Sequence, residues 1–113
     1  MNSDKNQSTV VNAKIAETKK LTQDIIELGT DIGKNGTEIK EKMRSAISLV
    51  GFVMSYPETN PEPNKNPLTD LALNVFELID KHPSQKDTIM TYLKLFGNFA
   101  NNLTDAVTKR KGS

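Results

Sequence analysis

The segment Gly29-Thr30-Asp31-Ile32-Gly33-Lys34-Asn35-Gly36 decides how the first half of this chain folds. It holds three glycines, each of which costs about 1 kcal/mol relative to alanine inside a helix, and an Asn-Gly pair, which favours a turn. These residues predict a hinge near Gly33–Gly36. The alternative is a single helix from 11 to 55 with a weak centre, because Ile25, Ile32 and Ile39 keep one helical phase across the segment. Both interpretations are compatible with the sequence, and the cost of the glycines favours the hinge.

Apolar and small residues recur on both sides of this segment at alternating spacings of four and three. Such spacing is typical of a heptad seam, the apolar stripe of a coiled coil, and charged residues of both signs occupy the outer positions. The pattern predicts a long helical segment or a helical hairpin over 10–56. The seam consists of Val11, Ile15, Thr18, Thr22, Ile25, Gly29, Ile32, Gly36, Ile39, Met43, Ala46, Val50 and Val53.

Four of the five prolines lie between residues 57 and 67 and separate the two halves of the chain. Proline has no N–H group and disrupts helices and strand ladders, so 57–67 is predicted to be an extended connector. The polar residues 1–9 predict a disordered tail, and 109–113 a basic tail. At 113 residues, the chain is long enough for one domain in total.

Two helices are predicted within 68–108. Asn66-Pro67 matches an N-cap followed by proline at the first helical position, and His82-Pro83 ends that helix. Ser84 and Asp87 match the spacing of a capping box, which starts the second helix. The seam of this last helix is Ile89, Leu93, Phe96, Ala100, Leu103 and Val107, and we expect Met90, Tyr92, Leu95 and Phe99 to widen it.

No stretch alternates between apolar and polar residues as a strand would, so the predicted fold class is all-α. We expect an elongated bundle of three or four helices, with a long N-terminal heptad helix that is hinged near Gly33–Gly36 in the favoured interpretation. Leu, Ile, Val and Phe make up 28 of 113 residues, above the roughly 20% below which disorder is the default. The net charge of +1 gives no global attraction to nucleic acid or to an anionic membrane.

The residues that carry chemistry are sparse. The absence of cysteine excludes disulfides, thiolate catalysis and cysteine-based zinc sites, and the single histidine, His82, fits a structural role at a helix end. Asp31 begins like a calcium loop, but the twelfth position is Lys42, where a bidentate glutamate is needed. Carboxylate pairs at Asp24/Glu27, Glu38/Glu41 and Glu77/Asp80 fall on polar helix faces. We therefore expect no enzyme activity, no metal and no cofactor.

Three features of the sequence bear on the cellular location and the source of the protein. The run Ala46–Met54 is the longest apolar stretch and about half the length of a membrane-spanning helix. The polar N-terminus has no apolar signal core, so we expect a cytoplasmic protein. Richness in Asn and Lys is typical of AT-rich genomes, such as those of low-GC bacteria and their phages or plasmids.

The functional hypothesis is a small protein–protein interaction module that forms a homodimer through its heptad seam. The run 46–54 is either enclosed by other helices or exposed as a binding patch. One alternative is a nucleic-acid-binding dimer that contacts phosphates through Lys109, Arg110 and Lys111. A second alternative is a membrane-surface protein that uses 46–54. The predicted interface residues are Ile25, Ile32, Ile39, Met43, Ile47, Val50, Phe52 and Val53.

Overall fold

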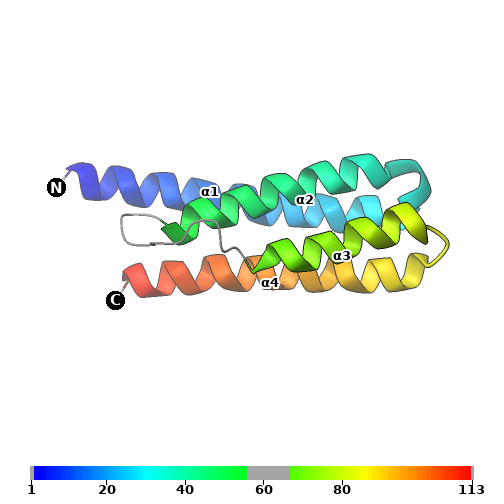
Figure 1. Ribbon diagram of the computed structural model, residues 1–113. Coiled ribbons are helices and arrows are strands. Elements are labelled where there is room, and N and C mark those ends of the chain that lie inside the picture. The colour runs from blue at the N-terminus through cyan, green and yellow to red at the C-terminus, as the bar shows by residue number, and fades with distance from the viewer. Residues whose placement is uncertain (1, 56–66, 113) are drawn as a thin grey trace.

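The computed structural model of the chain is an all-α, elongated bundle of 53 × 24 × 20 Å (Figure 1). It describes the backbone of residues 2–55 and 67–112, and the side chains of 9–54 and 67–106. These residues contain no strand, so the predicted fold class is confirmed. The elements are helix α1 (Asn2–Leu28), the 3₁₀ turn η1 (Gly29–Asp31), and helices α2 (Ile32–Ser55), α3 (Leu68–Lys81) and α4 (Lys86–Gly112).

The chain reverses direction at η1, and α1 and α2 run antiparallel as a hairpin (Figure 1). The two helices stay together along their length. Near the turn the Asp24 carboxylate lies 3.7 Å from the ammonium of Lys42, and at the far end Val11 packs with Val53. The turn lies upstream of the hinge predicted near Gly33–Gly36, because both of these glycines fall inside α2.

Close packing explains why residue 29, at the reversal, is a glycine. This glycine is buried, and a Cβ there would lie 2.6 Å from Cδ1 of Leu93 and 2.6 Å from Sδ of Met90. Only a residue without a side chain lets α4 approach the turn this closely. Asn35, expected to favour a turn, instead donates from Nδ2 to the carbonyl oxygen of Leu28 at 3.1 Å, which satisfies an orphan carbonyl at the end of α1.

The four helices surround one main core. Helix α1 contacts α2 and α4, α3 contacts the same two helices, and α2 also contacts α4 directly. The heptad seam faces inward on both sides of η1: its members are buried, except that Gly36 is half-buried. Leu28 and Ile32, which flank the turn, keep helical dihedral angles, and the seam keeps its phase through the hairpin. The main core consists of Ile25, Ile32, Ile39, Met43, Ala46, Val50, Leu68, Ala72, Val75, Ile79, Ile89, Leu93, Phe96 and Ala100.

Three buried threonines add polar groups to the packing of α1 and α4. Each hydroxyl donates to a carbonyl of its own helix: Thr18 to Lys14 at 2.7 Å, Thr22 to Lys19 at 2.8 Å and Thr104 to Asn101 at 2.9 Å. Among the described residues, no buried side-chain nitrogen or oxygen lacks a partner. These threonines therefore contribute to the packing without an unsatisfied hydroxyl group.

The ends of the elements differ from the sequence predictions in several places. Helix α1 begins at Asn2, within the predicted disordered tail, because residues 2–9 contain neither glycine nor proline to stop the helix from propagating. Helix α4 extends to Gly112, through most of the predicted basic tail, and starts at Lys86, two residues after Ser84. Helix α3 starts directly after Pro67 and ends at Lys81, as the His82-Pro83 signal predicted. The connector predicted over 57–67 lies outside the described residues, apart from Pro67.

Candidate interaction surface

The heptad seam, predicted to bind a second copy, forms the core of the chain itself. Six of the eight predicted interface residues are buried within the bundle, namely Ile25, Ile32, Ile39, Met43, Val50 and Val53. Ile47 is half-buried, and Phe52 is 38% exposed. Because the hairpin folds back and α3 and α4 cover it, the seam has no free face to offer a partner in this structure. The structure thus places these six positions in the core of the chain, and their role in an interface stays a prediction.

The apolar run 46–54 is mostly enclosed by the other helices. Ala46, Val50 and Val53 are fully buried, and Phe52, which is 38% exposed, is the one exposed large hydrophobic residue of the run. The ammonium of Lys14 on α1 lies 5.9 Å from the centre of the Phe52 ring, within the range of a cation–π contact. The prediction of an exposed patch for a membrane surface is not supported by this burial. Among the described residues, no helix is both long and apolar enough to span a membrane.

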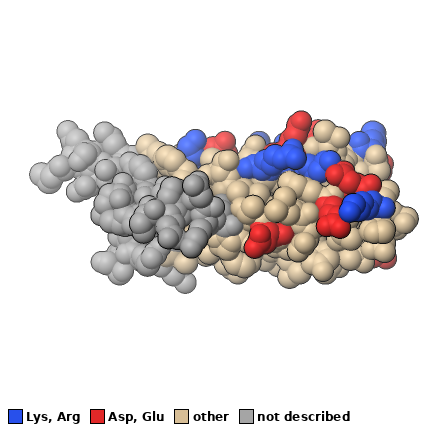
Figure 2. Space-filling view, in the orientation of Figure 1, with Lys and Arg blue, Asp and Glu red and all other residues tan. Residues whose placement is uncertain are grey.

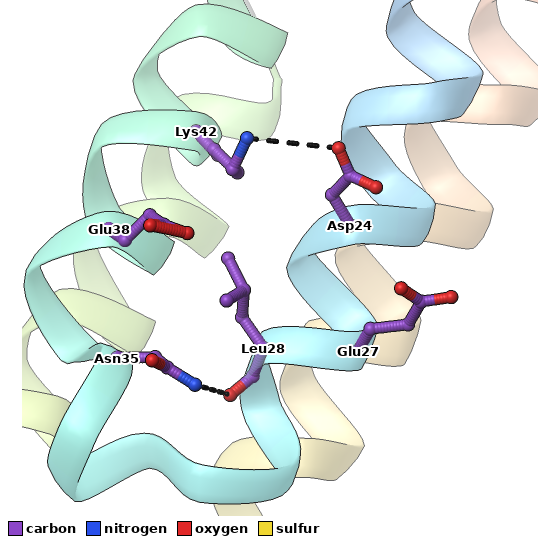
Figure 3. Close-up of a pocket in the computed structure, with 6 residues that line it drawn as sticks. All are labelled: Asp24, Glu27, Leu28, Asn35, Glu38 and Lys42. Carbon is purple, nitrogen blue, oxygen red and sulfur yellow. Dashed lines mark hydrogen bonds and ion pairs between the residues drawn. The ribbon is translucent and has the colours of Figure 1, made fainter.

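The polar groups noted in the sequence do not converge on a reactive centre within the described part of the chain. A shallow pocket of about 280 Å³ between α1 and α2 brings together Asp24, Glu27, Glu38 and Lys42 (Figure 3). The Lys42 ammonium pairs with Asp24 at 3.7 Å, while Glu27 points away from α2 in this view. His82 is exposed at the end of α3, where its backbone N–H donates to the Leu78 carbonyl at 2.8 Å.

Two further predictions concern ligands. No group of three or more metal-ligating side chains occurs in the ranges whose side chains are described. Lys109, Arg110 and Lys111 follow one another in the last turns of α4, but their side chains lie outside those ranges. The phosphate-contact alternative therefore stays a prediction.

Two of the five exposed large hydrophobic residues of the described chain lie one turn apart on α4, and the others are Val10 on α1, Phe52 on α2 and Leu73 on α3. Leu95 is 50% exposed and Phe99, one turn later, is 42% exposed. With Asn98, Asn102 and Leu103 they line an open groove of about 390 Å³, which we call the α4 groove. In the view of Figure 2, charged side chains gather over α2 and α3, whereas the lower edge, along which α4 runs in Figure 1, is largely free of them.

The most exposed large hydrophobic side chain outside α4 lies among charged residues. Leu73 on α3 is 56% exposed, but Asp70 and Glu77 lie three residues before and four residues after it, on the same face of the helix. Single exposed hydrophobic residues of this kind are normal in folded proteins. The α4 groove differs because it joins two large hydrophobic side chains without an intervening charge.

Sequence reasoning assigned Leu95 and Phe99 to the core, as residues that widen the last helical seam, and this assignment is wrong. In the structure the core side of α4 is occupied by Ile89, Leu93, Phe96 and Ala100, and the flank at Gly97 packs against Ile26 of α1. Leu95 and Phe99 therefore point away from the bundle. A signal was present in the sequence: Tyr92, Leu95, Phe99, Asn102 and Ala106 have a heptad spacing of their own.

Comparison of the chain with protein-family models, curated proteins and solved structures found no match.

Proposed function

We propose that this chain is a non-enzymatic protein–protein interaction module that binds its partner through the α4 groove. The observation that carries the proposal is the pair Leu95 and Phe99, which are 50% and 42% exposed and adjacent on one face of a well-anchored helix. A large hydrophobic residue gains stability when it leaves water, and adjacent exposed hydrophobic residues mark interaction sites. The proposed binding site is therefore the outer side of α4, whereas the sequence analysis predicted the heptad seam.

The rigid backing of the groove supports this assignment. Helix α4 is held on its inner side by the fully buried Leu93, Phe96 and Ala100, and on its flank by an ion pair of 2.9 Å between Asp105 and Lys19 of α1. A binding surface on a rigid helix loses little conformational entropy when a partner docks. The partner therefore meets a preformed surface.

The exposed fractions set the scale of the binding contribution. Full burial of a large apolar side chain is worth about 1.5–3 kcal/mol. The exposed halves of Leu95 and Phe99 would then contribute about 1.4–2.8 kcal/mol together, which is about a 10- to 100-fold change in the dissociation constant. Replacing both residues by serine is expected to weaken binding by that factor and to leave the folded state intact.

The test is site-specific photo-crosslinking in cells of the source organism. A photoreactive phenylalanine analogue is placed at Phe99 and, as a matched control, at Leu73, which is more exposed (56% against 42%) but lies between Asp70 and Glu77 on α3. We expect an adduct of discrete mass from position 99 that is absent from position 73 and is lost when Leu95 is replaced by serine. Equal adducts at both positions, or none at position 99, would contradict the proposal.

A further inference from the structure

We propose that Asn35 is a site of deamidation, the conversion of an asparagine side chain to a carboxylic acid, and that this reaction is coupled to opening of the turn between α1 and α2. The closed hairpin protects the Asn35 amide. In a molecule whose turn has opened, the reaction removes the hydrogen-bond donor that holds the turn closed. The inference goes beyond the proposed function and does not depend on the α4 groove.

The chemistry follows from the residue after Asn35, because Asn35-Gly36 is the only Asn-Gly pair of the chain. The backbone nitrogen after an asparagine is a nucleophile for the side-chain amide carbon, and glycine leaves this nitrogen unhindered because it carries no Cβ. A bond forms between the Gly36 nitrogen and Asn35 Cγ, and the bond between Cγ and Nδ2 breaks. The proton of the Gly36 nitrogen passes through water to Nδ2, which leaves as ammonia. Water then opens the resulting succinimide ring at either carbonyl group and gives aspartate or isoaspartate.

The hairpin holds both reacting groups away from each other's reach. Helix α2 starts at Ile32, and the helical pattern directs the N–H of Gly36 to the carbonyl four residues earlier, that of Ile32. Asn35 is half-buried, and its Nδ2 donates to the Leu28 carbonyl oxygen at 3.1 Å, across the turn (Figure 3). Ring closure therefore requires the first turn of α2 to unwind and the bond to Leu28 to break.

The first turn of α2 is weakly held, which makes this opening accessible. Gly33 is exposed, is a poor helix former, and offers a position where even an added Cβ would meet no atom within 4 Å. The Asp31 carboxylate accepts the Lys34 N–H at 3.4 Å, which is longer than the usual hydrogen bond, and both residues are exposed. Exposed segments with few packing contacts are the parts of a protein that open most readily. The bond from Asn35 to Leu28 thus spans a turn of low local stability.

The product of deamidation does not restore the closed turn. A carboxylate has no hydrogen to donate, so its oxygen and the Leu28 carbonyl oxygen would face each other as two acceptors. The new charge would also enter the shallow pocket between α1 and α2, whose lining already carries three carboxylates and one ammonium. That ammonium, on Lys42, pairs with Asp24 (Figure 3). Deamidation therefore converts a transient opening into a lasting loss of the bond that closes the hairpin.

Incubation of the purified chain at mildly alkaline pH, followed by peptide mapping with mass spectrometry, measures deamidation at each asparagine. We expect Asn35 to react fastest, and to react about 10- to 1,000-fold more slowly in the folded chain than in urea, because a minor open state is about 0.1–10% populated. Asn74, which is exposed on α3 and precedes Val75, is the internal control and should stay intact over the same period. Equal rates for Asn35 in the folded and unfolded chain, or a ratio beyond about 1,000-fold, would overturn the inference.

The variant Gly33→Ala tests whether opening of α2 limits the reaction. Alanine favours the helix over glycine by an amount that lowers the open fraction about five-fold, and the added methyl group has free space. The ratio of the deamidation rate in the folded chain to that in urea should therefore fall about five-fold. Taking this ratio removes any effect of the substitution on the chemistry itself. An unchanged ratio would refute the coupling between deamidation and the turn.

A pair of alanine variants tests whether the Asn35 amide holds the turn. Asn35 and Asn74 each have an aspartate four residues before and a glutamate three residues after, and both changes to alanine gain the same helix propensity. Asn35→Ala should nevertheless melt about 2–6 °C below Asn74→Ala, because it removes the bond to the Leu28 carbonyl. The wild-type chain, deamidated in urea and refolded, should likewise melt below the intact chain. Equal melting temperatures in either comparison, measured by circular dichroism, would show that the amide does not hold the turn and would overturn the inference.

Discussion

Two glycines near the turn between α1 and α2 should respond in opposite ways to the same added methyl group. A Cβ at Gly33 would meet no atom within 4 Å, and its backbone lies inside helix α2. A Cβ at Gly29 would lie 2.6 Å from both Leu93 Cδ1 and Met90 Sδ of α4. We therefore expect Gly33→Ala to raise the free energy of unfolding above that of the wild type. The free energy of unfolding of Gly29→Ala should be lower than that of Gly33→Ala.

The magnitude follows from helix propensity and packing. Replacing glycine by alanine in a helix gains about 1 kcal/mol, which Gly33→Ala should keep in full. Gly29→Ala gains no more than this, and it must displace two side chains, a form of overpacking that costs about 1–3 kcal/mol. The two variants should thus differ by about 1–3 kcal/mol. With about 2.1 cal/mol/K of unfolding entropy per residue, 113 residues give about 4 °C per kcal/mol, or about 4–12 °C between the two melting temperatures.

Thermal and urea unfolding followed by circular dichroism measures this difference. Adding Met90→Ala to Gly29→Ala serves as the rescue, because it removes one of the two atoms that the new methyl group meets. The double-mutant cycle should show a favourable coupling of about 1 kcal/mol. If Gly29→Ala instead raised the melting temperature as much as Gly33→Ala, α4 would not approach the turn, and the hairpin packing described above would be refuted.

Four further outcomes are expected. Phe96→Ala should lose about 3–5 kcal/mol in urea unfolding, because Phe96 is fully buried; a loss below about 1 kcal/mol would show that α4 does not face the core. Thr18→Val should change the unfolding free energy by no more than about 1 kcal/mol, because within the described residues the hydroxyl bonds to the Lys14 carbonyl of its own helix; a larger loss would reveal another partner. Asp80→Asn should cost at most about 1 kcal/mol at low salt and nothing measurable in concentrated NaCl, because the Asp80 side chain, which pairs with Lys40 at 2.8 Å, is 59% exposed. EDTA should leave helicity and melting temperature unchanged; a lower melting temperature on chelation would contradict a metal-independent fold.

The α4 groove illustrates why helical periodicity alone could not identify the buried face of α4. Apolar residues occupy nearly every side of this helix, from Met90 and Leu93 through Leu95 and Phe96 to Phe99. A helical repeat then fits more than one face, and the choice depends on where the neighbouring helices lie. The contact of Gly97 with Ile26 of α1 directs Phe96 inward and leaves Leu95 and Phe99 outside, and neither this contact nor its direction can be derived from spacing within α4.

The sequence by itself determined which face of α1 and α2 is apolar, because the spacing from Val11 to Val53 repeats with the helical period regardless of what covers it. It also determined the end of α3 at His82-Pro83, which follows from the local geometry of proline. Only the tertiary structure decided what covers the seam. A long straight helix would need a second chain to shield Ile25 and Ile39, whereas a reversal at Gly29 lets α3 and α4 shield them within one chain. At that reversal Leu93 and Met90, more than sixty residues away, lie close to Gly29, and such non-local contacts have no counterpart in the spacing of neighbouring residues.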